Sequence, residues 1–343
     1  MQKHTSYSPH ETPSAWDKKW QHMWHFLPRL PLNVSPYFNW PVSASAIGRW
    51  LFAAWFPLTE RLIFCVLAVI SFLFFLPSSE VIAAGGWGWI IQIYLKNMGL
   101  MLVIAGGLHL YLYRYHKQQK TLKFDKSMAN KDASRFTFGN QLRDNMFWTL
   151  ASGVTIWTAI EACLHYLQAT GIAPQLEFIQ NPVWFGVLFL AIPLWNSLWF
   201  SLIHRALHFP ILYRLAHHVH HRNISVGPWS GNAMHPLEHL IWMSGAFIYA
   251  LISCHPVHIL FSQYLSILGA VTSHSGYEGL VIGKKRLMKM GDFYHQLHHR
   301  LYECNYGTAE LGCDKWAGSF HDGTEQGAQN VRPQIGLKSS AGK

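Results

Sequence analysis

Six stretches of this sequence contain no lysine, arginine, aspartate or glutamate, and they limit what the chain can fold into. They are Leu62–Pro77, Asn97–Tyr113, Asn145–Ile160, Val183–Ile203, Leu240–Cys254 and Val257–Ser273. A bilayer core is spanned by about 20 apolar residues, with a range of roughly 17–25. We therefore expect an all-α integral membrane protein with four transmembrane helices. The last two stretches, with His255-Pro256 between them, predict a helical hairpin that enters the membrane or lies in its interface.

The composition excludes several other classes of protein. Half of the 343 residues are hydrophobic and only 13% are charged. The five cysteines form no C-x-x-C pair, so the sequence predicts neither a disulfide scaffold nor a thiolate zinc site. The net charge of +10 would suit a nucleic-acid partner. We expect none, because the basic residues gather on one side of the expected membrane.

The distribution of lysine and arginine predicts the orientation of the chain. The segment Arg114–Arg143 carries eight of them, whereas Ser78–Leu95 and Gln168–Pro182 carry none. Loops rich in lysine and arginine stay on the cytoplasmic side of a membrane. The N-terminus, the basic loop, the histidine-rich region and the C-terminus are therefore all expected in the cytoplasm.

Histidines are concentrated in one region, where 14 of the chain's 22 lie between His204 and His299. The pattern His-x-x-His-His occurs twice, at His217/His220/His221 and at His295/His298/His299, and His204/His208 forms a His-x-x-x-His pair. Positions i, i+3 and i+4 share one face of an α-helix, so each pattern can aim its imidazoles at one point. These are more ligands than one tetrahedral zinc accepts, which favours two metals, or one metal with a large surrounding shell.

The other histidines of this region differ in what they predict. A lone histidine is more often structural than a ligand, but His274 follows an apolar stretch, where polar groups are costly and usually functional. We therefore expect it to be a ligand. His235 and His239 are possible ligands or supporting groups, whereas His218 points about 100° away from His217 on a helix.

Four carboxylates are candidates to orient the ligands through the other imidazole N–H. They are Glu238, Glu278, Asp292 and Glu303. Glu303 has an alternative role as a solvated surface residue. Asp292 has an alternative role as the N-cap of the helix that carries His295.

Prolines and caps predict the helix boundaries around these histidines. The fourth span should end before Pro210, since the residue before proline disfavours the α region, and Pro210 can open the next helix. That helix should stop near Asn223. His235 is expected as the N-cap of a helix opened by Pro236. The last histidine helix should end at Asn305-Tyr306-Gly307.

The two ends of the chain carry weaker signals. Ser14 and Asp17 resemble a capping box, and Trp16, Trp20, Met23, Trp24 and Leu27 recur at helical spacing. This pattern predicts an amphipathic helix, packed either on protein or in the membrane plane. Residues 322–343 are rich in glycine, glutamine and serine and are expected to be disordered.

Taken in order, the histidine motifs resemble those of the fatty acid hydroxylase/sterol desaturase superfamily. The motifs are His204-Arg-Ala-Leu-His208, His217-x-x-His220-His221, His235-Pro-Leu-Glu238, His274-Ser-Gly and His295-x-x-His298-His299, followed by Asn305-Tyr306-Gly307. The resemblance covers about residues 185–310. Alkane hydroxylases and acyl desaturases also use histidine boxes, but the compact spacing and the His-Pro-Leu-Glu and His-Ser-Gly elements favour the sterol desaturase group.

The resemblance implies a membrane enzyme that uses two iron ions and O2 to hydroxylate or desaturate a lipid C–H bond; zinc could replace iron in a purified sample. The implied metal ligands are His204, His208, His217, His220, His221, His274, His295, His298 and His299. No catalytic residue apart from these is implied. Two electrons must come from a separate ferredoxin, cytochrome or reductase, because the sequence has no His-Pro-Gly-Gly motif of a fused cytochrome b5 domain. The lipid could be a sterol, a fatty acyl chain or a related molecule.

Two other functions compete with this one. A metal carrier or transporter would use the same histidines without chemistry, although transporters usually place such residues near the midplane of several spans. A membrane zinc hydrolase would need about three protein ligands, and the chain has no His-Glu-x-x-His motif.

The expected organisation has four parts. Residues 1–58 form a cytoplasmic or interfacial segment, 59–183 the first membrane helices and the basic loop, 184–310 the catalytic domain with a cytoplasmic histidine-rich helical cap, and 311–343 a C-terminal tail. The sequence predicts no oligomeric state.

Overall fold

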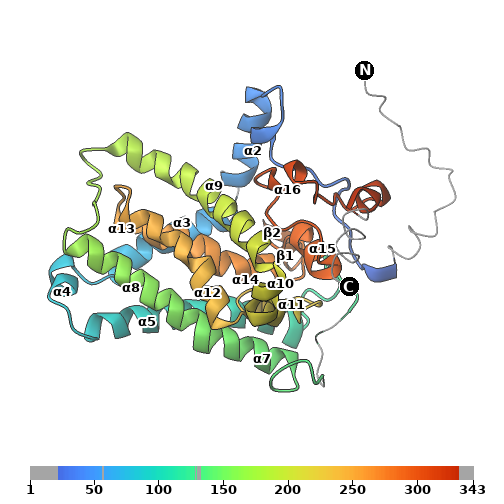
Figure 1. The fold of residues 1–343 in the computed structure, drawn as a ribbon, viewed down its shortest axis with the longest axis horizontal. Helices are drawn as coiled ribbons and strands as arrows, with labels where there is room; N and C mark the ends of the chain where they lie inside the picture. Colours follow the sequence, from blue (N-terminus) through green and yellow to red (C-terminus); the bar gives the residue numbers. More distant parts are fainter. Residues whose placement is uncertain (1–21, 56–57, 128, 130–132, 332–343) are drawn as a thin grey trace.

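The computed structural model describes residues 22–55, 58–127, 129 and 133–331, and these are mostly helical (Figure 1). Three helical stretches are long and apolar enough to cross a membrane, namely Gly88–Arg114, Gln141–Ala169 and Pro182–Leu207. The first consists of α5 (Gly88–Met101), α6 (Gly107–His109) and two π-helical turns at Leu102–Gly106 and Leu110–Arg114. The second consists of α7 (Gln141–Phe147), a π-helical segment at Trp148–Val154 and α8 (Thr155–Ala169), and the third is α9 (Pro182–Leu207).

Among the described residues, a fourth span is found only if two helices are counted together. Helices α2 (Ala44–Trp55) and α3 (Glu60–Phe74) meet at an angle of 56°. Alone, α3 has 15 residues and rises about 22 Å, which is less than the roughly 30 Å of a bilayer core. The expected span at Leu62–Pro77 therefore reaches the required length only with α2.

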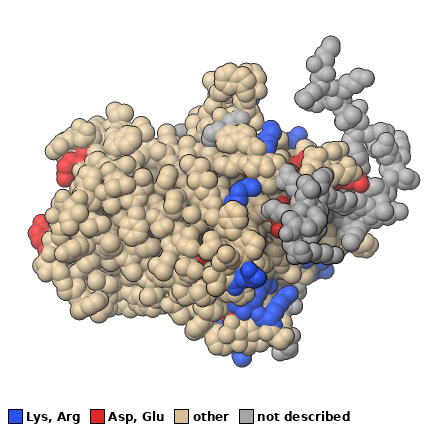
Figure 2. Space-filling view, in the orientation of Figure 1, with Lys and Arg blue, Asp and Glu red and all other residues tan. Residues whose placement is uncertain are grey.

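The outer surface of these helices is apolar, as a lipid environment requires. Exposed fractions reach 64% at Leu95, 73% at Val103 and 72% at Phe74. Figure 2 shows a broad uncharged face over the helical body and a gathering of lysine and arginine towards one end. Together with the long apolar helices, this surface identifies a membrane protein.

Polar contacts also hold the spans together inside the apolar body. Lys96 on α5 and Glu161 on α8 form a buried ion pair, with side chains 4% and 0% exposed. Asn97 adds a hydrogen bond from its Nδ2 to Glu161 Oε2 at 3.0 Å. Short helix α4 (Ser79–Ala83) packs on α8 at the end of the molecule opposite to the histidines.

The expected membrane hairpin has one arm inside the helical bundle. It is formed by α12 (Pro236–Met243), a 3-10 segment (Ser244–Ala250), α13 (Pro256–Gln263), a π-helical turn (Tyr264–Leu268) and α14 (Gly269–Ser273). Every residue of α13 is buried, since the helix contacts α3, α8 and α9; Figure 1 shows it between α8 and α9. Its polar backbone ends are therefore sheltered by protein rather than by lipid headgroups.

The histidine-rich end contains short elements. They are α10 (Pro210–Leu212), a π-helical turn (Tyr213–His217), α11 (His218–His221), a 3-10 turn (Pro228–Ser230), β1 (Gly279–Ile282), β2 (Lys285–Lys289), α15 (Phe293–Leu301) and α16 (Cys313–Trp316). The boundaries expected at Pro210, Pro236 and Asp292 are confirmed. The antiparallel hairpin of β1 and β2 is an element that the sequence reasoning missed.

One expected boundary was placed too late. Helix α15 ends at Leu301, where Tyr302 adopts a φ of 66°, and not at Asn305-Tyr306-Gly307. Asn305 instead donates from Nδ2 to the carbonyl oxygens of Tyr294 and His321 at 3.1 and 3.0 Å. Its role is to fix the loop that follows the helix.

The helix expected near the N-terminus is wrong from Trp24 onward. The backbone of Trp24 pairs with that of Asp125, and its ring lies edge-on to Phe293 at 5.0 Å between centroids. Leu27 follows in irregular chain. The aromatic side chains therefore serve a local core, while Ser14, Trp16, Asp17 and Trp20 lie outside the described residues.

The expected disordered tail is also wrong for residues 322–331. Residues 325–331 are helical, Val331 is only 2% exposed, and Leu32 N–H donates to the carbonyl of Asp322 at 2.8 Å. A few apolar side chains and one backbone contact are enough to anchor this polar segment. Residues 332–343 lie outside the described part of the chain.

Candidate metal centre

Nine buried or half-buried histidines converge in two adjacent groups. One, here called the His208 cluster, contains His204, His208, His217, His221 and His298. The other, the His274 cluster, contains His220, His274, His295 and His299. Within each group one nitrogen of every ring lies within 4.8 Å of the others. The structure thus brings together all nine residues that the sequence motifs suggested as ligands.

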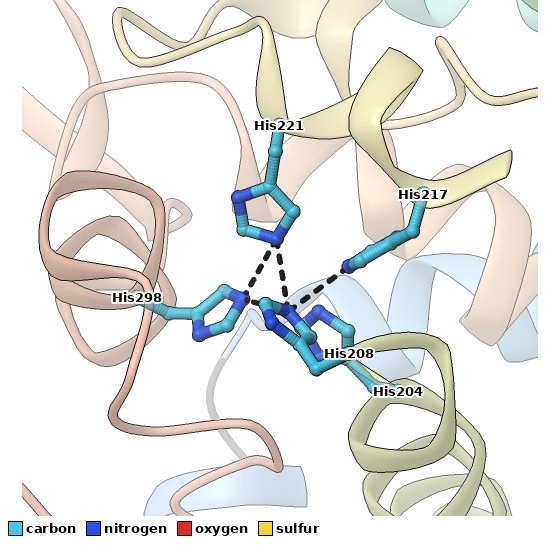
Figure 3. Close-up of side chains that lie close together, drawn as sticks. All are labelled: His204, His208, His217, His221 and His298. Atoms are coloured by element: carbon cyan, nitrogen blue, oxygen red, sulfur yellow. Dashed lines mark hydrogen bonds between the residues drawn. The ribbon is translucent and has the colours of Figure 1, made fainter. Parts of the chain in front are cut away.

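Three helical segments and two helix ends supply these side chains. Helix α9 carries His204, and His208 is its C-cap. The segment of Tyr213–His217 and α11 provides His217, His220 and His221. Helix α15 provides His295, His298 and His299, and His274 is the C-cap of α14. Figure 3 shows the five rings of the His208 cluster pointing toward one another.

Each His-x-x-His-His motif is divided between the two clusters. In the first motif His217 and His221 belong to the His208 cluster and His220 to the His274 cluster. In the second motif the division is reversed, with His298 in the His208 cluster. The expectation that one motif aims three imidazoles at one point is therefore wrong. Neighbouring residues on a helix diverge by about 100°, and this angle sends each adjacent pair to two centres.

The distances between imidazole nitrogens match those of ligands around a metal. Nε2 of His208 lies 3.1 Å from Nε2 of His221 and 3.2 Å from Nε2 of His298, and the latter two atoms are 3.1 Å apart. Two nitrogens bound to one metal at about 2.0–2.1 Å, with an angle of about 90–110° between them, lie roughly 2.9–3.4 Å apart. The triangle thus has the size that a shared metal ion would impose.

Hydrogen bonds on the far side of the rings direct lone pairs into the clusters. Nδ1 of His204 lies 2.6 Å from the carbonyl oxygen of Tyr306, and Nδ1 of His298 lies 2.6 Å from that of Cys304. A carbonyl oxygen only accepts, so Nδ1 carries the proton and Nε2 of the neutral ring presents a lone pair. Converging lone pairs repel one another unless a cation lies between them.

The buried atom Nε2 of His204 gives a direct test of whether the site fits a metal. Within the described part of the chain it has no hydrogen-bond partner, and such orphaned polar atoms are costly in a folded protein. A metal ion bound by the His208 cluster would satisfy it. The residues present therefore fit a metal centre.

The electrostatic environment keeps the imidazoles neutral. Burial, and next the neighbouring imidazoles, lower the pKa of His221, His298 and His299 well below the usual value near 6.5. The same causes act on His220 and His295. Neutral imidazole is the form that binds metals, so the ligands are ready for metal at neutral pH.

Glu238 contacts the ring nitrogen of His217 that points away from the His208 cluster. Its Oε1 lies 2.7 Å from Nδ1 of His217, with both side chains almost inaccessible. Burial raises the pKa of Glu238 well above its usual value. A metal on Nε2 would add the positive charge that stabilises the buried carboxylate, as in other carboxylate–histidine–metal arrangements.

Replacing Glu238 with alanine should weaken metal binding at the His208 cluster by about 10–100-fold, the usual cost of losing such a support. The ring of His217 would lose the acceptor that fixes its proton and its orientation. Competition against a chelator of known affinity measures the effect. Glu238→Gln, which keeps an acceptor oxygen, is the matched control. Wild-type affinity in Glu238→Ala would contradict the assigned role.

The other sequence candidates lie outside the two clusters. His239 uses both ring nitrogens elsewhere, with Nδ1 2.9 Å from Ser152 Oγ and Nε2 3.2 Å from the carbonyl of Asn232. His235 caps α12 by accepting from Leu237 N–H at 3.2 Å. His218 is exposed, as its angle from His217 indicated.

Asp292 acts as a helix cap. Its Oδ1 accepts from Tyr294 N–H at 3.0 Å, so it fixes the start of α15. This corresponds to the alternative that the sequence left open for this residue. Asp292 also lines the cavity described below.

Asp314 is a supporting residue that the sequence reasoning missed. It is 1% exposed, and its carboxylate accepts from Arg205 Nη2, the hydroxyls of Tyr294 and Ser319, and the backbone N–H groups of Tyr306 and Gly307, at 2.6–3.1 Å. These bonds hold the Tyr306 carbonyl against His204. No local motif marks this role, because it arises only when the loop folds back on α9 and α15.

A cavity of about 450 Å³ reaches the His274 cluster. His220, His274 and His295 line it, whereas no member of the His208 cluster does. Its walls include Trp50, Pro193, Phe200, Trp242 and Leu265. A volume of this size holds a small organic ligand, so the His274 cluster faces the space where a ligand can bind.

Comparison with known proteins gives one family and several relatives. Residues 189–319 match the family model described as fatty acid hydroxylase. Methylsterol monooxygenase 1 of Danio rerio is 32% identical over 120 residues, which are 34% of this chain and 41% of that protein. Cholesterol 25-hydroxylase of Rattus norvegicus is 30% identical over 153 residues, 43% of this chain and 49% of that protein.

A third relative matches over a longer stretch. Delta(7)-sterol-C5(6)-desaturase of Nicotiana tabacum is 23% identical over 259 residues, 71% of this chain and 90% of that protein. The chain spans about half the length of the first curated relatives it matches. No solved structure matches it. The names of the three relatives describe a monooxygenase, a hydroxylase and a desaturase.

Proposed function

The chain belongs to the fatty acid hydroxylase/sterol desaturase superfamily, and on that premise we propose that it is a membrane-bound oxygenase acting on a lipid. The proposed reaction uses two iron ions, O2 and two external electrons. It hydroxylates or desaturates an unactivated C–H bond. The relatives, whose names describe sterol oxidation, hydroxylation and desaturation, support a lipid-modifying oxidoreductase.

The observation that carries the proposal is the convergence of nine imidazoles in two clusters of five and four. Five and four ligands suit two metals better than one. An all-imidazole set suits iron as well as zinc, copper or nickel, and the superfamily favours iron. The nine residues of the two clusters are the proposed ligands.

Bound iron would supply the activation of O2 needed to attack the C–H bond. The chain's own residues would bind the ions, orient the ligands and position the lipid. The neutral imidazoles would hold the ions, and Glu238, Asp314 and the carbonyls of Tyr306 and Cys304 orient the rings. The apolar part of the cavity wall would place the lipid against the His274 cluster.

The proposal requires a separate electron donor, such as a ferredoxin, a cytochrome or a reductase. We further propose that the histidine clusters and both termini lie in the cytoplasm, since the loop between Arg114 and Arg143 is rich in lysine and arginine. A basic surface there would also suit an acidic donor. The orientation of the chain in the membrane already explains why this loop is basic, so donor docking is the weaker of the two explanations.

The test measures metal content, O2 uptake and lipid products on detergent-purified protein reconstituted with a lipid extract and a reduced ferredoxin system. We expect about two irons per chain and O2 uptake that requires both lipid and donor. Oxygen-18 from labelled O2 in the lipid product identifies hydroxylation, and a product lighter by two hydrogens identifies desaturation. Iron binding without O2 uptake under these conditions would contradict the oxygenase and favour a metal carrier.

Metal exchange adds a second test. If the sample contains zinc, its removal and replacement by ferrous iron should restore turnover, since zinc has no redox chemistry. Activity supported by zinc under anaerobic conditions would point to a hydrolase instead.

A further inference from the structure

A second cavity lies beside the first, on the outer side of the helical bundle. It has a volume of about 330 Å³ and lies between α3, the helical stretch Gly88–Arg114 and the hairpin of β1 and β2. Apolar side chains dominate its lining: Ile63, Phe64, Val103, Ile104, Leu108 and Met288. We call it the lateral groove. The functional site described above does not include it.

The rim of the lateral groove is exposed at the membrane-facing surface. Val103 is 73% exposed and Ile282 is 50% exposed. Val103 lies within a stretch long and apolar enough to span a membrane. In a bilayer, lipid acyl chains cover such a surface, so the molecule best placed to enter the groove is a lipid of the adjoining leaflet.

The hairpin that forms one wall of the groove has the chemistry of a membrane-surface element. Lys284 lies in its turn and Lys285 and Arg286 begin β2, and apolar Ile282 and Leu287, 50% and 43% exposed, flank these three residues. Basic residues at a membrane surface attract anionic headgroups, and apolar neighbours insert among the acyl chains.

The hairpin is fixed to the end of the membrane helix. The Tyr111 hydroxyl donates a hydrogen bond to the carbonyl oxygen of Val281 at 2.8 Å. Gln118 Nε2 donates to the carbonyl of Gly279 at 2.8 Å, and Val281 N–H donates to Gln118 Oε1 at 2.9 Å. These bonds hold the wall of the groove at the level where the span ends.

The lateral groove meets the cavity of the His274 cluster at two residues. Glu60 and Met290 line both spaces. The hydroxyl of Thr272 donates to Glu60, and Thr272 lies two residues before His274. A lipid passing from the groove to the histidines would have to displace the Met290 side chain and separate Glu60 from Thr272.

We propose that the lateral groove is a portal through which a membrane lipid passes from the bilayer to the His274 cluster. The β1–β2 hairpin is its membrane-facing wall, and Glu60, Thr272 and Met290 form the barrier between groove and cavity. The ligand class is an apolar lipid, either an acyl chain or a sterol. This inference rests on the proposed function for the purpose of the portal, but lipid occupancy of the groove is testable without turnover.

Gly107 offers a way to fill the groove. It lines the groove, and a Cβ added there would meet no atom within 4 Å. Gly107→Phe should therefore fit while its ring occupies the groove. Gly99→Phe is the matched control, because Gly99 is exposed on the same membrane helix, also has open space at its Cβ, and lines neither cavity.

The experiment photolabels the full-length protein in vesicles that contain a diazirine sterol or a phosphatidylcholine with a diazirine in its acyl chain. Mass spectrometry then locates the label. We expect one probe or both to label the peptide of Leu280–Met288. Gly107→Phe should lower this labelling by about fivefold or more, because an aromatic side chain fills much of such a groove. Gly99→Phe should leave it unchanged.

Equal labelling of the hairpin peptide in wild type and Gly107→Phe would overturn the portal, as would labelling no stronger than at other lipid-facing positions. Metal content reports whether the variant folds. If Gly107→Phe loses its metal, Ile282→Trp on the exposed rim takes its place in the same comparison. Label in the groove of a protein without oxygenase activity would support lipid binding and reject only the proposed function.

Discussion

Replacing His298 with alanine should remove the metal from the His208 cluster, and replacing its neighbour His299 should remove it from the His274 cluster. Each single variant should fall from about two metals per chain to about one, and the double variant to about none, because each ion loses a ligand from its own set. Lipid oxidation should drop to background in all three. No sequence-based interpretation assigns these adjacent residues to different ions, so the result tests the geometry itself.

Metal analysis of desalted protein, together with a spectroscopic signature of the proposed iron pair, measures the outcome. The signature should disappear in each single variant, even where one ion remains. The control is His218→Ala, which removes an exposed histidine next to a ligand and should leave both ions in place. Loss of both metals in His298→Ala together with full retention in His299→Ala would contradict two independent sets.

The second large effect is expected from Asp314→Ala. The variant leaves Arg205 without its carboxylate and strips acceptors from Tyr294, Tyr306 and Gly307. Removing one partner of a buried ion pair costs about 3–5 kcal/mol, and since Arg205 is 38% exposed we expect about 3 kcal/mol. The Tyr306 carbonyl would also lose its position against His204, so metal affinity at the His208 cluster should fall by about 10–100-fold.

Thermal unfolding and chelator competition, both measured against wild type, separate the two effects. Asp314→Asn keeps one acceptor oxygen and should recover part of the lost stability and part of the lost metal affinity. Glu177→Ala removes an exposed carboxylate that is distant in sequence from Asp314, and it should change neither the unfolding temperature nor the metal affinity. An Asp314→Ala protein that unfolds earlier but binds metal as wild type does would show that Asp314 stabilises the fold without positioning the ligands.

The sequence was informative where local chemistry decides the structure. The apolar stretches predicted the long helices, and proline and aspartate predicted the boundaries at Pro210, Pro236 and Asp292. The histidine spacing predicted eight of the nine side chains that meet, and the place of His274 after an apolar stretch predicted the ninth. The sequence was uninformative where contacts between segments far apart in the chain decide the structure. The division of each His-x-x-His-His motif depends on how α11 and α15 face each other across two centres, and the role of Asp314 depends on a loop folding back over α9.

The ends of the chain show the same limit. Trp24 and Leu27 have helical spacing, yet the neighbouring backbone of Phe124 and Asp125 draws this segment into extended pairing. Composition predicted disorder for residues 322–331, but the side chain of Val331 is buried. In both cases tertiary contacts outweigh a weak local preference.

The buried pair of Lys96 and Glu161 has a consequence for how the protein enters a membrane during synthesis. A single charge near the middle of a membrane helix costs about 2.5–3.5 kcal/mol on insertion scales. Lys96 lies in the first third of the stretch Gly88–Arg114, which is made first, and it would carry part of that cost alone until the segment bearing Glu161 emerges about 65 residues later. The two segments are thus better inserted as a neutral pair than one after the other, which makes helix pairing a step of biogenesis as well as of the final fold.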